Sequence, residues 1–268
     1  MARTRGRSRR LVLPLLLALL LAACDGASSD EPAEEPTVVI ETPPDDACRV
    51  LTPQDAQAGS NDTEIVDCDE EHTARTIVVD EFPAALADAA HTDPRLGQHV
   101  YDVCDRRFAR VVGGDESVRM RSLLSWVWFR PSAPAWEAGA RWFRCDVVGG
   151  TDTADTYRPL PATLTKILDD QPADWMACVR GPQVAGGPRI PCSQPHDWRA
   201  ATTIRLGRAD DPYPGDRLAE VRTRDYCRSS ISAWLDYPDS YEFGFTWFGR
   251  AEWEVGNRRS ICWARVEP

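Results

Sequence analysis

The sequence predicts an α+β protein made of two tandem small disulfide-bonded domains, each with a small antiparallel sheet and one main helix. A pattern of four cysteines occurs twice along the chain. In each copy a β-branched run follows a histidine, and a stretch with apolar residues at helical spacing surrounds the third cysteine. Several short strands with a single helix in each copy favour the α+β class.

The chain begins with a segment typical of a lipoprotein signal. Residues 1–10 carry five arginines and no acid, and residues 11–23 are apolar but too few to span a bilayer. Small residues then precede Cys24 in the sequence LAAC. We therefore expect residues 1–23 to be a signal peptide and Cys24 to become the lipidated first residue. This predicts a lipid-anchored protein on the extracytoplasmic face of the cell membrane.

The segment after Cys24 is predicted to be a disordered acidic tether. Residues 25–46 contain eight acids, four prolines and no basic residue, so they cannot bury enough apolar surface to fold. Without residues 1–23 the chain has 26 basic and 42 acidic residues, a net charge of −16. Such acidity argues against a nucleic-acid partner, because phosphate binding depends on clustered Lys and Arg. Membrane affinity must then come from acyl chains on Cys24.

Eight cysteines remain after Cys24, and an even number in an exported chain predicts disulfides. Zinc ligation is the alternative, but the chain has no C-x-x-C pair, which structural zinc sites usually contain. The eight are Cys48, Cys68, Cys104, Cys145, Cys178, Cys192, Cys227 and Cys262.

The two halves repeat more than their cysteines. His72 lies four residues after Cys68, and His196 lies four residues after Cys192. Each half then ends on Trp-Glu-x-Gly with a cysteine six positions after the glycine. These residues are Trp136, Gly139 and Cys145 in the first half, and Trp253, Gly256 and Cys262 in the second. We predict a first domain over 47–150, a linker over 151–174 and a second domain over 175–268.

The elements of each domain follow in the same order. We expect strands at 75–79, 123–129 and 141–145 and a helix within 99–112 in the first domain, and strands at 201–205, 243–248 and 258–263 and a helix within 220–235 in the second. Gly139 and Gly256 are expected at the turn between the last two strands.

This order favours pairing the first cysteine of each domain with the second, and the third with the fourth. The first two flank the opening strands, and the other two join the helix to the final strand. The predicted disulfides are Cys48–Cys68, Cys104–Cys145, Cys178–Cys192 and Cys227–Cys262. Four cysteines allow three pairings in each domain, and the sequence leaves the other two open.

The repeated Cys-x-x-x-His element has two interpretations. One is a metal-binding or catalytic pair. The other is an imidazole that bonds the backbone beside a disulfide and orders the turn, and it is favoured because a disulfide-bonded cysteine cannot ligate a metal. The acidic run around His72 (Asp67, Asp69, Glu70 and Glu71) resembles a cation site, but such charge runs are usually solvated. We predict no metal and no cofactor.

Catalysis finds little support in the sequence. The common hydrolase, zinc-protease and phosphate-loop motifs are absent. Glu137 and Glu254 recur in both halves, but neither has an identifiable catalytic partner, and we assign no catalytic residue. The ten tryptophans have two interpretations: they fill a small core, or they line a ligand groove.

These motifs together resemble the septum formation domain of actinobacterial exported proteins, over roughly 48–148 and 178–266. The second half fits best, through Cys192, His196, Pro214, Gly215, Cys227, Trp253, Gly256 and Cys262. The first half resembles a more diverged copy. The resemblance implies an association with cell division and no established enzymatic activity. A single lysine among many arginines also suits an actinobacterium.

We therefore expect a non-enzymatic lipoprotein that binds an envelope protein or a wall component. The alternative is an envelope hydrolase with a site between the two domains, using Glu137 or Glu254 with His72 or His196. A third possibility is a spacer without a ligand.

Overall fold

The structure is a computed structural model that describes residues 41–151, 154–208, 210–254 and 256–266. The expected signal peptide, Cys24 and the tether up to residue 40 lie outside the described residues. Within the described part, no helix combines the length and the apolar character needed to cross a bilayer.

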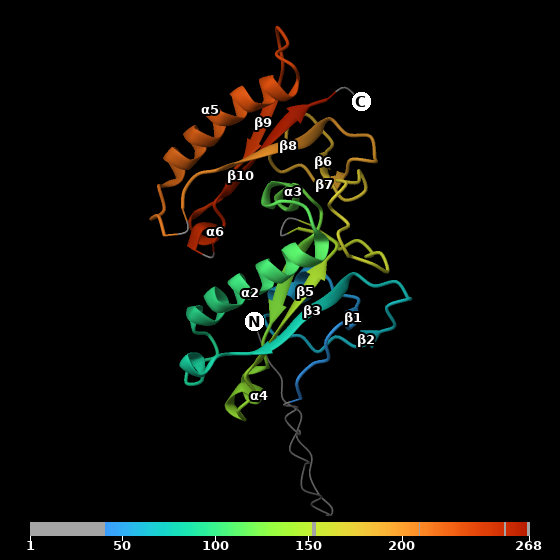
Figure 1. Cartoon of the computed structure of the whole chain (residues 1–268), viewed down its shortest axis with the longest axis vertical. Helices are drawn as coiled ribbons and strands as arrows, with labels where there is room; N and C mark the ends of the chain where they lie inside the picture. The colour runs from blue at the N-terminus through green and yellow to red at the C-terminus, as the bar shows by residue number, and fades with distance from the viewer. Residues whose placement is uncertain (1–40, 152–153, 209, 255, 267–268) are drawn as a thin grey trace, which may run out of the picture. The chain divides into compact units, whose positions relative to one another are not determined.

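The first half is an antiparallel sheet with one long helix lying along it (Figure 1). Its five strands pair in the order β2-β1-β3-β5-β4. They are β1 (Cys48–Arg49), β2 (Ile65–Val66), β3 (Ala74–Glu81), β4 (Ser125–Phe129) and β5 (Trp142–Val148). The helices are α1 (Pro53–Gln57), α2 (Pro94–Val112), α3 (Glu116–Met120) and α4 (Ala133–Glu137), with a 3-10 turn η1 (Ala84–Leu86).

The second half repeats this architecture in the same strand order, β7-β6-β8-β10-β9. Its strands are β6 (Ala177–Val179), β7 (Arg189–Pro191), β8 (Trp198–Arg205), β9 (Phe243–Thr246) and β10 (Arg259–Arg265). Its helices are α5 (Asp216–Trp234) and α6 (Arg250–Glu254). Two antiparallel sheets, each with one main helix, confirm the predicted α+β class.

The long helix of each half forms because its apolar residues recur on one side. In α2 the buried side chains are Leu96, Val100, Cys104, Phe108 and Val112, a strict i, i+4 series. The helix begins where the Asp93 side chain accepts a hydrogen bond from the Arg95 N–H, with a proline at the first helical position. Helix α5 buries the analogous set Ala219, Thr223, Cys227 and Ile231.

The connection before the final strand differs from the expected simple turn. In both halves it contains a short helix, α4 or α6, whose tryptophan is buried. Gly139 and Gly256 follow these helices with φ of +102° and +112°, a backbone region that favours glycine.

One hydrophobic core runs through both halves and the segment between them. It joins residues of α2, such as Leu96, to residues of the second sheet, such as Trp263. The predicted linker contributes Leu160, Leu164 and Leu168, all buried in this core. The linker segment is therefore packed, although it contains neither helix nor strand among its described residues.

The first sheet also buries a polar network. Arg144 and Asp146 are almost fully buried and form an ion pair of 3.1 Å between Nε and Oδ2. Thr76 donates to the other oxygen of Asp146 at 2.8 Å and accepts from Arg49 at 2.9 Å. Because the charges are paired and hydrogen-bonded to each other, their burial is tolerated.

Candidate functional site

The four disulfides join the pairs expected from the sequence: Cys48–Cys68, Cys104–Cys145, Cys178–Cys192 and Cys227–Cys262. All eight cysteines after Cys24 are thus used. In each half one bridge ties the opening strand to the turn just after the second strand, and the other ties the long helix to the final strand.

The two motif histidines make the same contact in both halves. Nδ1 of His72 lies 2.8 Å from the carbonyl oxygen of Glu70, and Nδ1 of His196 lies 2.7 Å from that of Gln194. Since a carbonyl can only accept, Nδ1 carries the proton in each ring. Each imidazole closes the turn between its cysteine and the following strand, as the structural interpretation predicts.

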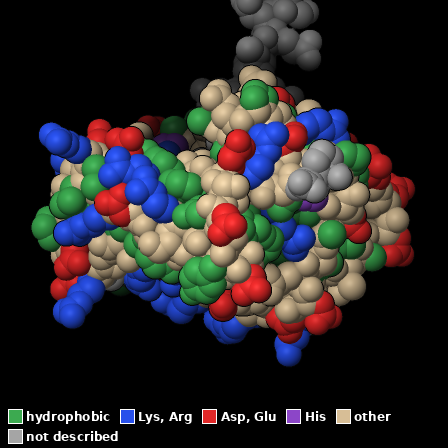
Figure 2. All heavy atoms as spheres, turned by 90° about the horizontal axis from the view of Figure 1, so that it is seen from above, with side chains coloured by type: hydrophobic (Ala, Val, Ile, Leu, Met, Phe, Trp, Pro, Cys, Tyr) green, Lys and Arg blue, Asp and Glu red, His purple; other side chains and the backbone are tan. Residues whose placement is uncertain are grey.

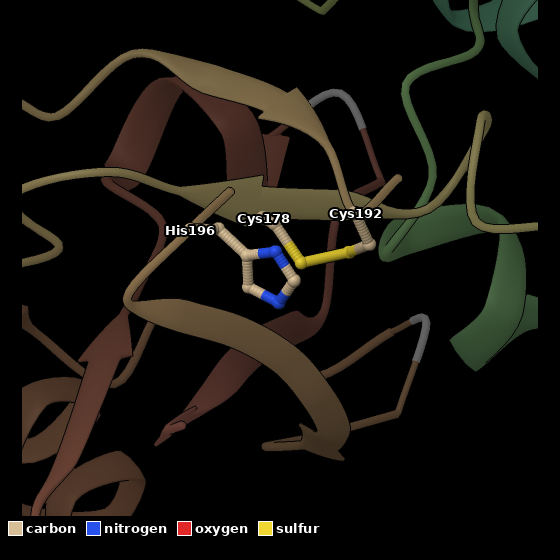
Figure 3. A group of neighbouring side chains, drawn as sticks. All are labelled: Cys178, Cys192 and His196. Carbon is tan, nitrogen blue, oxygen red and sulfur yellow. A yellow bond between two sulfur atoms is a disulfide. The ribbon is translucent and has the colours of Figure 1, made fainter. Parts of the chain in front are cut away.

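Cys178, Cys192 and His196 come close enough together to suggest a metal site. Their possible ligand atoms all lie within 4.8 Å of one another. Figure 3 shows the imidazole beside the bond between the two sulfur atoms. Zinc binds thiolates, and two sulfurs joined to each other are not thiolates. In the oxidised protein this group supports the fold.

The repeated Trp-Glu-x-Gly motif is followed, two residues after its glycine, by an arginine that sequence reasoning missed. Arg141 stacks 4.2 Å from the centre of the Trp136 ring and donates to the Trp136 carbonyl. Arg258 stacks 3.9 Å from the centre of the Trp253 ring and donates to the Trp253 carbonyl. The signal was present in the sequence, because both arginines stand five residues after their tryptophan. Each pair fixes the loop that precedes the final strand.

A pocket of about 520 Å³ lies where the two halves meet. From the first half it is lined by residues of α1, α2, α3 and β4, and from the second by the end of β9, the α6 loop and the start of β10. Its aromatic lining residues are Tyr101, Phe108, Trp126, Tyr157, Trp247 and Phe248. Its charged lining residues are Asp105, Glu116, Glu252, Arg119, Arg189, Arg258 and Arg259. The volume lies in the range of small-molecule sites, and the lining is more strongly charged than in most of them.

Helix α3 holds the two halves together beside this pocket. Glu116 pairs with Arg259 at 2.8 Å and with Arg205 at 3.4 Å. The next residue, Ser117, accepts a hydrogen bond from Thr203 at 2.9 Å. This helix was not predicted from the sequence, and it has no counterpart among the described residues between α5 and β9.

Asp105 is the most unusual carboxyl in the pocket. It is half-buried, and burial raises its pKa, while Arg119 and a hydrogen bond from Trp126 oppose the shift. The carboxyls of Glu116 and Asp102 raise the pKa further. No arginine in the described part of the chain forms an ion pair with Asp105.

Tyr101 forms the wall beside Asp105. Its ring meets the Trp126 ring edge-on, with 5.5 Å between the ring centres. Burial and the neighbouring carboxyl of Asp105 raise the pKa of Tyr101 to about 12, so the phenol is neutral at ordinary pH. The pocket therefore has a neutral aromatic wall next to a desolvated carboxyl group.

The residues named for the hydrolase alternative do not build this pocket. Neither His72 nor His196 is among the lining residues, and the same holds for Glu137 and Glu254. The two glutamates are exposed on α4 and α6. The pocket therefore does not bring together the residues named for that alternative. Of the motif residues, Gly256 does line the pocket.

The tryptophans divide between core and surface. Five are buried: Trp136, Trp175, Trp198, Trp253 and Trp263. Trp126 and Trp247 are half-buried on the pocket, whereas Trp234 is exposed at the end of α5. On the face shown in Figure 2, acidic and arginine side chains are interspersed with hydrophobic ones, so that face does not present a field of one sign.

Comparison with known families supports the sequence resemblance. The profile of a family described as Septum formation matches residues 47–262, which include both four-cysteine halves and the segment between them. No curated protein and no solved structure shows a significant match to the chain. Since the profile spans most of the chain, the protein belongs to the septum formation family.

Proposed function

We propose that this protein is a lipid-anchored, extracytoplasmic binding protein of the cell envelope that acts in septum formation without catalysing a reaction. The family gives the link to cell division. The pocket between the halves is the observation that carries the binding role, because it offers aromatic surface and both signs of charge to a ligand.

The anchored, exported location is supported by the cysteines. Four disulfides are typical of a protein that folds in an oxidising compartment. Because the eight other cysteines pair with one another, the chain offers Cys24 no disulfide partner. That fits a cysteine reserved for a lipid, directly after the apolar segment. The acidic residues that follow would hold the folded part away from an anionic membrane surface.

Metabolic labelling tests the anchor. Cells of the native host that express the full chain are fed an alkyne fatty acid, and the protein is recovered and coupled to a dye. The wild type should carry the label and sediment with membranes, and Cys24→Ala should lose both properties. Ser28→Ala, a neighbouring substitution, should behave as the wild type. Labelled Cys24→Ala or a cytosolic wild type would contradict the proposal.

A further inference from the structure

We propose that the pocket between the halves binds a short peptide or amino acid with free ends, whose ammonium group faces Asp105 and whose carboxylate faces Arg259. This rests on the proposed binding function and names its ligand class. The two residues come from different halves, one on α2 and the other at the start of β10, and both line the pocket. A zwitterion matches a lining that presents carboxyl and guanidinium groups together.

The ammonium end is defined by Asp105 and its aromatic neighbours. The carboxyl lacks an ion pair within the described residues, whereas Glu116 is already paired with two arginines. Tyr101 and Trp126 lie beside it. A carboxyl group flanked by aromatic rings suits a small organic cation, which gains both an ion pair and contact with the rings.

The carboxylate end is defined by Arg259. Its Nη2 pairs with Glu116 at 2.8 Å and its Nη1 donates to Thr203 at 3.2 Å, so the side chain is held in place. Its Nε is buried and has no hydrogen-bond partner. That atom is closed off from the pocket, but Nη1 and Nη2 each have a second N–H that these two contacts do not use, and about a fifth of the side chain is exposed, so a ligand carboxylate can reach them. A preorganised guanidinium with unused N–H donors is suited to recognising a carboxylate.

The burial of Asp105 favours a binding role for this residue over a purely structural one. Burial raises its pKa, so keeping this carboxyl ionised costs the folded protein free energy. A residue kept only for the fold would be better as a neutral amide, which could still accept the Trp126 hydrogen bond. Groups that cost stability in this way concentrate at functional sites.

Titration calorimetry on the full-length protein in detergent tests the inference. The probe is trialanine with free ends, compared with N-acetyl-trialanine and trialanine amide. Blocking either end should weaken binding about 10-fold or more, the loss expected for a hydrogen bond to a charged group. Alanine and dialanine tell whether a free amino acid is sufficient. Equal binding of free and capped trialanine, or no binding at millimolar concentration, would overturn the proposal.

Variants of Asp105 and Arg259 test which residue binds each end of the peptide. Asp105→Asn should weaken free trialanine about 10-fold and leave N-acetyl-trialanine unchanged, and the exposed neighbour Asp102→Asn should change neither. Arg259→Lys keeps a positive charge near Glu116 but lacks the planar fork of guanidinium donors, so it should lose the preference for the free carboxylate over the amide. An unchanged preference in either variant would refute the corresponding assignment. Fatty-acid labelling of Cys24 is independent of these results, so a negative result here would not contradict the proposed lipid anchor.

Discussion

Replacing Gly256 by alanine tests whether the two halves are packed as the structure shows. A Cβ at Gly256 would lie 2.6–3.1 Å from three ring atoms of Tyr101, which belongs to the other half. The ring cannot swing aside freely, because it packs against Trp126. Gly139 is the matched control, since it holds the equivalent motif position with nearly the same φ, and its Cβ would meet nothing within 4 Å.

Both substitutions strain the backbone, but only Gly256→Ala also forces a methyl group against packed atoms. At these positive φ values an alanine is strained by about 1–3 kcal/mol at either position. Gly256→Ala adds the cost of forcing a methyl group into packed atoms, about 1–3 kcal/mol. We therefore expect Gly139→Ala to lower the free energy of unfolding by about 1–3 kcal/mol and Gly256→Ala to lower it by a further 1–3 kcal/mol or so.

Urea denaturation followed by tryptophan fluorescence measures both values under the same conditions. The difference between the two variants cancels the shared backbone strain and reports the contact between the Gly256 turn and α2. Tyr101→Ala in the Gly256→Ala background should recover part of the loss, because it opens the space that the new methyl group needs. Equal destabilisation by Gly139→Ala and Gly256→Ala would refute the packing of the two halves around the pocket.

Three further predictions concern buried groups. Burial raises the pKa of Asp105, so the folded state loses stability as the pH rises through that pKa and the carboxyl ionises. Asp105→Asn should therefore raise the melting temperature at pH 7, and this gain should vanish below about pH 4, where the carboxyl is protonated in both the folded and the unfolded state. Scanning calorimetry at both pH values measures the two differences, and an equal gain at both would contradict the prediction. Asp146→Ala leaves Arg144 buried without its partner and should cost about 3–5 kcal/mol in urea denaturation, while an unaffected variant would mean that water reaches this pair. Replacing Cys104 and Cys145 together by alanine releases a loop with a sequence separation of 41 and should cost about 4 kcal/mol in the same assay; no change in the urea midpoint would contradict the bridge.

Local patterns in the sequence were sufficient to predict much of the fold. The i, i+4 spacing around Cys104 and Cys227 predicted both long helices, since one apolar side of a helix must be buried. The order of strand and helix around the cysteines indicated the disulfide pairs. The motif histidines were interpreted as turn-ordering groups, and both do bond a carbonyl two residues earlier.

A site between the two domains was one of the hypotheses, but the residues that line the pocket could not be predicted, because they are brought together by contacts between distant parts of the chain. Asp105 and Arg259 lie on different halves, and no periodicity relates them. Helix α3 is a single turn whose role comes from Glu116 reaching Arg259, which nothing near it in the sequence indicates. The linker has the composition of a loop, yet its leucines are buried because both halves pack onto them.

The anchored binding role is tested most directly by cross-linking in intact, dividing cells of the native host. Tagged full-length protein is captured after cross-linking, with Cys24→Ala and Asp105→Asn captured in parallel at equal expression. The account predicts that the wild type recovers a defined component of the envelope or the division machinery and that Cys24→Ala does not. A well-expressed, disulfide-bonded wild type that recovers no such component, or recovers it equally without Cys24, would contradict the account.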